Sequence, residues 1–211
     1  MQMLDQPVVH IIDDDASLRF GIESLLRSVG IVSRSYEAVS AFLEAKLDDA
    51  PGCLLLDVRM PGIGGLEFQA QLESLGILYP VVMITGHADV PMSVRAMKAG
   101  AVDFLSKPFR DQDLLDAVAS ALERDGARRV VAAENATLAK RYASLSPRER
   151  EVMSLVTIGK LNKQVAFELG LSEVTVKIHR GSAMRKMSAA TLPDLVSMAQ
   201  QLGVKADKPA V

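Results

Sequence analysis

Short apolar runs alternate with amphipathic stretches along the first 123 residues. The runs are bounded by turn formers or acids, which is typical of short buried strands. They predict strands at residues 7–12, 31–36, 52–57, 80–85 and 101–105. Between them, apolar residues recur at helical spacing and predict helices near residues 18–29, 37–46, 66–75, 88–99 and 111–123. This alternation favours an α/β domain at residues 6–123, with a parallel sheet of flavodoxin-like strand order 2-1-3-4-5.

The pattern changes after residue 123. Residues 124–143 keep a helical composition that weakens at Asp125-Gly126, and we expect a partly helical linker there. Ser146 and Glu149 then form a capping-box pattern at the start of a helix. Further helices are predicted at residues 162–169, 173–187 and 192–202, and the first two of these, joined through a short turn, favour a helix-turn-helix. Residues 144–205 are therefore predicted to form a small all-α domain.

The net charge of -2 conceals an uneven distribution. Residues 1–123 contain 9 Lys and Arg against 18 Asp and Glu, whereas residues 124–211 contain 15 against 8. A basic second part suits an anionic partner, and its helix-turn-helix pattern makes double-stranded promoter DNA the expected one.

Composition excludes several other classes. The single cysteine, Cys53, rules out an internal disulfide framework and most cysteine-based zinc sites. No apolar run approaches the roughly 20 residues of a membrane span, and the first six residues lack the character of a signal peptide. We expect a cytoplasmic protein without a membrane partner.

Polar residues gather at the predicted carboxyl ends of the strands. Asp13 and Asp14 follow the first strand, Asp57 ends the third, Thr85 ends the fourth and Lys107 follows the fifth. Ligands of such sheets bind where the strand order reverses, here between strands one and three. Adjacent carboxylates repel unless a cation joins them, and hard oxygen ligands from two loops suit Mg²⁺. A hydroxyl and an ammonium then suit phosphoryl oxygens, so the pattern predicts phosphorylation of Asp57.

These residues, with Met60-Pro61 and Lys107-Pro108, resemble the receiver domain of bacterial response regulators. Two further segments are similar to the FixJ branch in particular, residues 85–92 (TGHADVPM) and 97–104 (MKAGAVDF). The resemblance implies that Asp57 accepts a phosphoryl group from a phosphohistidine of a sensor histidine kinase. It implies no enzyme activity beyond slow autodephosphorylation.

The resemblance also assigns roles around Asp57. It implies Mg²⁺ held by Asp14, Asp57 and the backbone carbonyl of Arg59, with Asp13 often acting through water. Thr85 and Lys107 would bind the phosphoryl oxygens.

The same resemblance implies a switch. Phe104 falls at the aromatic position whose ring turns inward as Thr85 moves toward the phosphate. It also implies a cis Lys107-Pro108 bond, which is plausible because X-Pro bonds tolerate cis at low cost.

The helix at residues 173–187 has two distinct faces. Four residues should pack inward: Val176, Arg180, Ala183 and Met187. The opposite face mixes basic, hydroxyl and small apolar side chains, which suits phosphates and base edges. We expect DNA contacts from Lys163, Val174, Thr175, Lys177, Ile178, Gly181, Ser182 and Arg185.

Three segments of the second domain resemble the LuxR/NarL-type DNA-binding domain: residues 145–152 (LSPREREV), 162–166 (NKQVA) and 172–180 (SEVTVKIHR). The resemblance implies a fourth helix that serves dimerisation. Several relatives carry a basic residue at the position of Gly181, so their half-site preference does not transfer to this chain.

Together the two domains predict a phosphorylation-activated transcription regulator. Phosphorylation would shift the face at residues 88–99, 101–105 and 111–123 toward a homodimer that binds promoter DNA and acts on RNA polymerase. One alternative is a haloacid-dehalogenase-type phosphohydrolase with Asp13 as nucleophile, because residues 13–17 (DDDAS) fit its first-strand motif. The other is a constitutive DNA-binding protein whose receiver is not phosphorylated.

Overall fold

The computed structural model describes residues 6–46, 49–86 and 89–204. Residues 87 and 88, inside the motif at 85–92, and residue 205, the expected end of the second domain, lie outside the described residues. The chain divides into two compact units between Arg129 and Val130.

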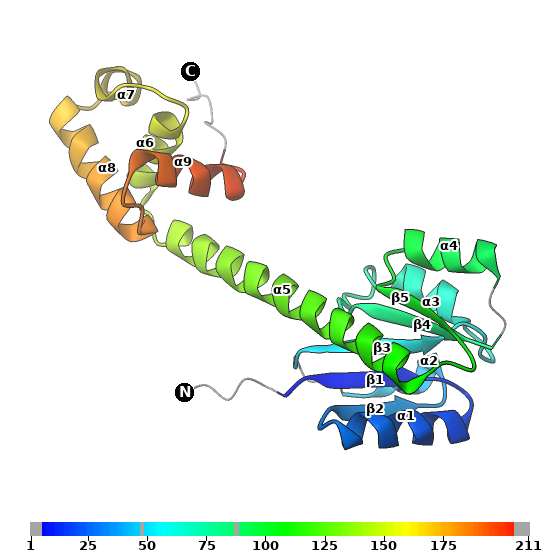
Figure 1. Ribbon diagram of the computed structural model, residues 1–211. Coiled ribbons are helices and arrows are strands. Elements are labelled where there is room, and N and C mark those ends of the chain that lie inside the picture. Colours follow the sequence, from blue (N-terminus) through cyan, green and yellow to red (C-terminus); the bar gives the residue numbers. More distant parts are fainter. Residues whose placement is uncertain (1–5, 47–48, 87–88, 205–211) are drawn as a thin grey trace. The chain divides into compact units, whose positions relative to one another are not determined.

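A five-stranded parallel sheet forms the centre of the first unit, in the predicted order β2-β1-β3-β4-β5 (Figure 1). The strands are β1 (Val8–Ile12), β2 (Val32–Tyr36), β3 (Gly52–Asp57), β4 (Val81–Thr85) and β5 (Asp103–Ser106). β1, β3 and β4 are buried along their whole length, because they lie inside the sheet with helices over both faces. The predicted α/β fold is therefore confirmed.

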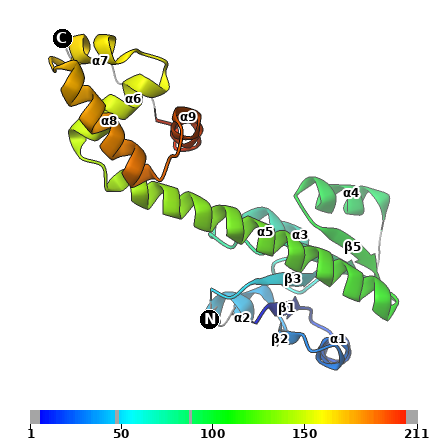
Figure 2. The same cartoon turned by 60° about the vertical axis from the view of Figure 1, so that its left-hand side comes forward.

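Helices cover both faces of the sheet (Figures 1 and 2), and each face has its own hydrophobic cluster. On one face, α1 (Ala16–Ser28) and the beginning of α5 (Asp111–Ala143) pack against the strands. The other face is covered by α2 (Val39–Glu44), α3 (Gly65–Gln71) and α4 (Val90–Lys98). α2 and α3 are shorter than their apolar periodicity predicts.

α5 is one continuous helix, so the expected weakening at Asp125-Gly126 does not interrupt it. The Asp125 side chain is fully buried. It accepts hydrogen bonds from the backbone N–H of Gly52 at 3.1 Å, from Arg128 Nη2 at 2.5 Å and from Arg129 Nε at 2.7 Å. These donors compensate for removing the carboxylate from water, and they attach the helix to the start of β3.

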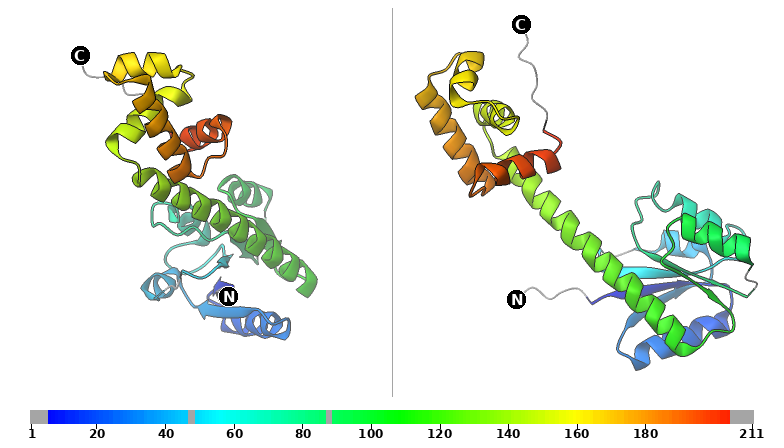
Figure 3. Two further views of the ribbon diagram at one scale, coloured as in Figure 1. Left: turned by 90° about the vertical axis from the view of Figure 1, so that its left-hand side faces the viewer. Right: turned by 45° about the horizontal axis from the view of Figure 1, so that its top comes forward.

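The second unit is helical, with α6 (Pro147–Thr157), α7 (Asn162–Leu169), α8 (Glu173–Met187) and α9 (Leu192–Gln201) (Figure 3). The predicted capping box at the start of α6 is present, since Ser146 and Glu149 each accept the other's backbone N–H. The apolar faces of the four helices meet in one core, with Val152, Met153, Val165, Val176, Met187 and Leu195 among its buried residues.

Among the described residues, no helix is both long enough and apolar enough to cross a membrane.

Candidate phosphoacceptor site and nucleic-acid interface

The loops after β1 and β3 bring three carboxylates together. Asp13, Asp14 and Asp57 each offer a carboxylate oxygen within 4.8 Å of the others. Asp13 and Asp57 are buried, whereas Asp14 is exposed. Hard oxygen atoms at this spacing, with one side open to solvent, fit a divalent cation that keeps several of its waters, as Mg²⁺ does.

Lys107 contacts two of these acids. Its Nζ lies 2.6 Å from Asp13 Oδ2 and 3.1 Å from Asp57 Oδ1. Burial alone would lower the pKa of Lys107, but the bonds to the two carboxylates outweigh it and the pKa is raised. The side chain is therefore a charged ammonium beside Asp57, able to pair with an incoming phosphoryl oxygen.

Burial raises the pKa of the Asp57 carboxyl, and the neighbouring Asp13 charge acts in the same direction. The bonds from Lys107 and from the Arg59 backbone N–H, 3.1 Å from Asp57 Oδ2, oppose this shift. The Asp13 and Asp57 carboxylates are thus buried side by side, and a bound cation would offset the repulsion between them.

Thr85 lies at this edge, at the carboxyl end of β4, whereas Phe104 lies opposite Met83, nearer the start of β5. Thr85 is fully buried at the end of β4, and its carbonyl oxygen accepts from the Lys107 backbone N–H at 2.7 Å. Phe104 is half-buried against the cluster under α2, α3 and α4. The Lys107-Pro108 bond is cis, as the resemblance implied. Parallel strand ends therefore gather the predicted polar residues at one edge of the sheet.

Two residues that support the site were not predicted. A Cβ at Gly65 would lie 2.1 Å from the Asp57 carbonyl oxygen, so only glycine lets the chain pass there. Arg19 holds the loop after β1, because its Nη1 donates to the Asp13 carbonyl oxygen at 2.6 Å. The glycine pair at residues 64 and 65 was the available signal for the first. The sequence carried no comparable signal for the arginine.

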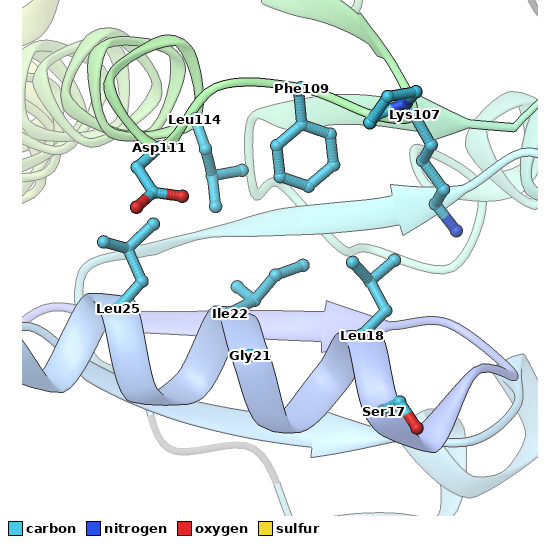
Figure 4. Close-up of a pocket in the computed structure, with 10 residues that line it drawn as sticks. Ser17, Leu18, Gly21, Ile22, Leu25, Lys107, Phe109, Asp111 and Leu114 are labelled. Carbon is cyan, nitrogen blue, oxygen red and sulfur yellow. The ribbon is translucent and has the colours of Figure 1, made fainter.

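A hollow of about 480 Å³ lies next to the Lys107 end of the site, between α1 and the start of α5 (Figure 4). Leu18 and Ile22 point from α1 toward Phe109 and Leu114 on the opposite side. An apolar surface therefore borders the phosphoacceptor site.

In the second unit, α8 presents the faces that its sequence predicted. Val176, Ala183 and Met187 are buried, whereas Val174 is 66% exposed and Ile178 is 64% exposed. Arg180 is half-buried and its Nη1 lies 3.4 Å from Asn162 Oδ1 of α7. The exposed face leaves small apolar side chains available to a DNA groove.

The other residues expected to bind DNA differ in their surroundings. Lys163, Lys177 and Arg185 are exposed. Thr175 is half-buried, with its hydroxyl 2.8 Å from that of Ser172.

Gly181 and Ser182 lie further along α8. A Cβ at Gly181 would meet nothing within 4 Å. Ser182 instead donates to Glu149 Oε1 at 2.6 Å, so its hydroxyl is engaged inside the unit. Glu149 was predicted only as a capping residue, because its partners on α8 are distant in sequence.

Comparison with known proteins identifies both units. Residues 9–119 match the response regulator receiver domain family, and residues 143–199 match the family described as bacterial regulatory proteins, luxR family. Nodulation protein W of Bradyrhizobium diazoefficiens is 51% identical over 95% of this chain and 88% of its own. The transcriptional regulatory protein FixJ of Azorhizobium caulinodans is 43% identical, over 93% of each chain. The solved structure of the response regulator StyR is 44% identical with a TM-score of 0.82, over 93% of this chain and 99% of its own.

Proposed function

Because this chain belongs to the two-component response regulators that join a receiver domain to a luxR-type DNA-binding domain, we propose that phosphorylation of Asp57 controls its binding to promoter DNA. Residues 6–123 would be the receiver, residues 124–143 the linker and residues 144–205 the DNA-binding domain. The observation that carries the proposal is the contact of Lys107 with two of three clustered carboxylates, one of which is Asp57. Family membership makes a sensor histidine kinase the phosphoryl donor.

Mg²⁺ is the proposed cofactor. Asp14, Asp57 and the backbone carbonyl of Arg59 would hold it, with Asp13 acting through water. The clustered carboxylate oxygens support this assignment. When bound, the cation would offset the charge of the carboxylates and of the phosphoryl group.

In the proposed transfer, an Asp57 carboxylate oxygen attacks the phosphorus of the donor phosphohistidine. The phosphorus–nitrogen bond breaks as the acyl phosphate forms, and the imidazole leaves with its electron pair. Lys107 then pairs with a phosphoryl oxygen, and the Thr85 hydroxyl donates to another. Removal of the phosphoryl group by water would be slow, since the role is regulatory rather than enzymatic.

We place kinase docking on α1 and the hollow beside it. This surface borders the phosphoacceptor site, and Leu18 and Ile22 line it from α1. An apolar contact there would hold the donor histidine near Asp57 without using the residues that receive the phosphoryl group.

Phosphorylation would change the α4 side of the receiver. Movement of Thr85 toward the phosphate would let the half-buried Phe104 turn inward. α4 exposes Val90, Val94 and Met97, an apolar face that suits a homodimer contact. Dimerisation would bring two copies of α8 to two half-sites about one helical turn of DNA apart.

On DNA, the proposed contacts are those of Lys163, Val174, Thr175, Lys177, Ile178, Gly181 and Arg185. Ser182 was also expected to contact DNA, but its bond to Glu149 competes with that role. Bound at a promoter, the dimer would act on RNA polymerase.

The two alternatives fare differently. The receiver match over residues 9–119 favours a regulator over the phosphohydrolase with Asp13 as nucleophile. Constitutive DNA binding is separated from the proposal by experiment, because it makes operator affinity indifferent to phosphodonor.

The test is gel filtration of the full chain with and without acetyl phosphate and Mg²⁺. The native chain should shift from monomer to dimer, and Asp57→Asn should not. Asp15→Asn is the matched control, since it changes a neighbouring acid outside the three-carboxylate cluster and Asn still caps α1. Dimerisation of Asp57→Asn by the phosphodonor would refute the mechanism.

A further inference from the structure

One carboxylate in the second unit binds two side chains of the helix proposed to read DNA. Glu149 lies in the first turn of α6, and its side chain is 7% exposed. Its Oε1 accepts from Ser182 Oγ at 2.6 Å, and its Oε2 accepts from Lys186 Nζ at 2.7 Å. Oε2 also accepts the Ser146 backbone N–H at 2.7 Å. The carboxylate thus connects the start of α6 to the second half of α8.

Ser182 and Lys186 lie on one face of α8, because they are four residues apart. The Lys186 ammonium also donates to the Ser144 carbonyl oxygen at 3.2 Å. A hydroxyl beside an ammonium is a combination by which proteins bind the phosphates of DNA. Here the anion that accepts from both groups is a carboxylate of the protein itself.

The ion pair between Glu149 and Lys186 is maintained at neutral pH. The bonds from Lys186, Ser182 and the Ser146 backbone lower the pKa of Glu149 to about 2. The Glu149 carboxylate is therefore charged at neutral pH and keeps its bonds to Ser182 and Lys186. The Lys186 side chain is itself 40% exposed, so it is the bond to Glu149, and not burial, that holds its ammonium. Lys177, on the same helix, is also exposed and has no ion pair among the described residues.

We propose that Glu149 is a positioning residue that determines specificity, by withholding Lys186 and Ser182 from the DNA backbone. This inference rests on the proposed DNA-binding function. Contacts to phosphate are independent of sequence and dominate non-specific binding. Because Glu149 keeps Lys186 from contacting phosphate, a larger share of the DNA affinity comes from base contacts. These would be made by exposed residues such as Val174 and Ile178.

The test measures the affinity of the full-length phosphorylated chain for two duplexes across a salt series. One duplex is selected by the native protein from a random library, and the other is its scrambled sequence. The variants are Glu149→Gln, Lys186→Met and the double variant, and the matched control is Lys177→Met. Gln can complete a capping box, so Glu149→Gln should keep its fold, which thermal unfolding checks.

Glu149→Gln should bind the scrambled duplex several-fold more tightly, with a salt dependence of log K that is steeper by about one, because Lys186 is released to a phosphate. Its preference for the selected duplex should fall about tenfold. Lys186→Met should leave the salt slope of the native chain unchanged, whereas Lys177→Met should reduce it by about one. In the double variant, the salt dependence of log K should return to that of the native chain, because Lys186 is no longer present to bind phosphate.

Two results would overturn the inference. The first is that Lys186→Met reduces the salt dependence of log K as much as Lys177→Met does. This would mean that Lys186 already binds phosphate in the native chain. The other is an equal loss of affinity of Glu149→Gln for both duplexes with no change of slope, which a purely structural role predicts. If the native chain selected no duplex and bound neither, the proposed DNA-binding function would fail, and the inference with it.

Discussion

Gly65 begins α3 beside the backbone of Asp57, and a methyl group there would lie 2.1 Å from the Asp57 carbonyl oxygen. Gly65→Ala must therefore push α3 away from the end of β3. We expect the receiver to lose about 1–3 kcal/mol of unfolding free energy and to be phosphorylated more slowly by acetyl phosphate.

The control for this prediction is Gly21→Ala. Its Cβ would meet nothing within 4 Å on α1, so the variant should gain up to about 1 kcal/mol. Denaturant unfolding and phosphorylation rates of both variants provide the measurement. Equal behaviour of the two variants would contradict the steric argument.

Gly181 poses the opposite case, since space is open around it in the middle of α8. Gly181→Ala should stabilise the DNA-binding domain by about 0.5–1 kcal/mol, because glycine is a poor helix former. If the α8 backbone approaches DNA closely at this point, the same change should weaken operator binding several-fold. Thermal unfolding and titration with DNA separate the two effects, and unchanged affinity would remove Gly181 from the interface.

At the scale of elements, α5 is held to the sheet by the buried Asp125. Burial would raise the pKa of Asp125, but hydrogen bonds from Arg128, Arg129 and the Gly52 backbone lower it below its ordinary value. Asp125→Asn leaves these arginines without their buried partner, and we expect a loss of roughly 3 kcal/mol in unfolding free energy at pH 7.

The sign of the pH dependence follows from the lowered pKa of Asp125. The native chain should exceed Asp125→Asn in unfolding free energy by the full amount above the ordinary aspartate pKa of about 4. This difference should shrink as pH falls through the lowered pKa of Asp125 in the folded state. Asp116→Asn is the control, because it changes an exposed acid of the same helix and should be near neutral. If the difference in unfolding free energy between Asp125→Asn and Asp116→Asn did not narrow in acid, the stabilising role of the Asp125 carboxylate would be refuted.

α1 offers a second prediction at this scale. Leu18→Ala should slow phosphotransfer from the cognate sensor kinase about tenfold, since it removes an apolar side chain that lines the hollow beside Lys107. Acetyl phosphate needs no docking surface, so its rate should not change. Equal slowing with both donors would show that Leu18 acts on the phosphoacceptor site itself.

At the scale of the whole molecule, phosphorylation in one unit must reach the DNA-binding helices in the other. A dimer provides this coupling without a fixed contact between the units, because two linked DNA-binding domains gain affinity through a raised effective concentration. Met97→Lys places a charge on the exposed face of α4 and should abolish both dimerisation and the gain in operator affinity on phosphorylation.

Leu43→Lys is the matched control for this prediction, because Leu43 of α2 is 43% exposed and Met97 is 47% exposed. It should dimerise as the native chain does. Gel filtration and DNA titration with acetyl phosphate and Mg²⁺ measure both effects. A dimer of Met97→Lys would place the interface elsewhere.

The sequence by itself determined the order of the elements, the parallel sheet and the polar set at its edge. This was possible because strand and helix periods are local, and because the carboxyl ends of parallel strands must meet at one edge. Asp13, Asp57 and Lys107 could therefore be assigned to one site from their positions at strand ends alone. The capping box of Ser146 and Glu149 was likewise readable within four residues.

Only the tertiary structure decided which partners those residues have. It showed Lys107 bonded to Asp13 and Asp57 together, Asp125 buried against the start of β3, and Glu149 bound to α8. Such contacts join side chains far apart in sequence and depend on how whole elements pack. The periodicity of a helix indicates which face is buried, but not which distant donor or acceptor that face will meet.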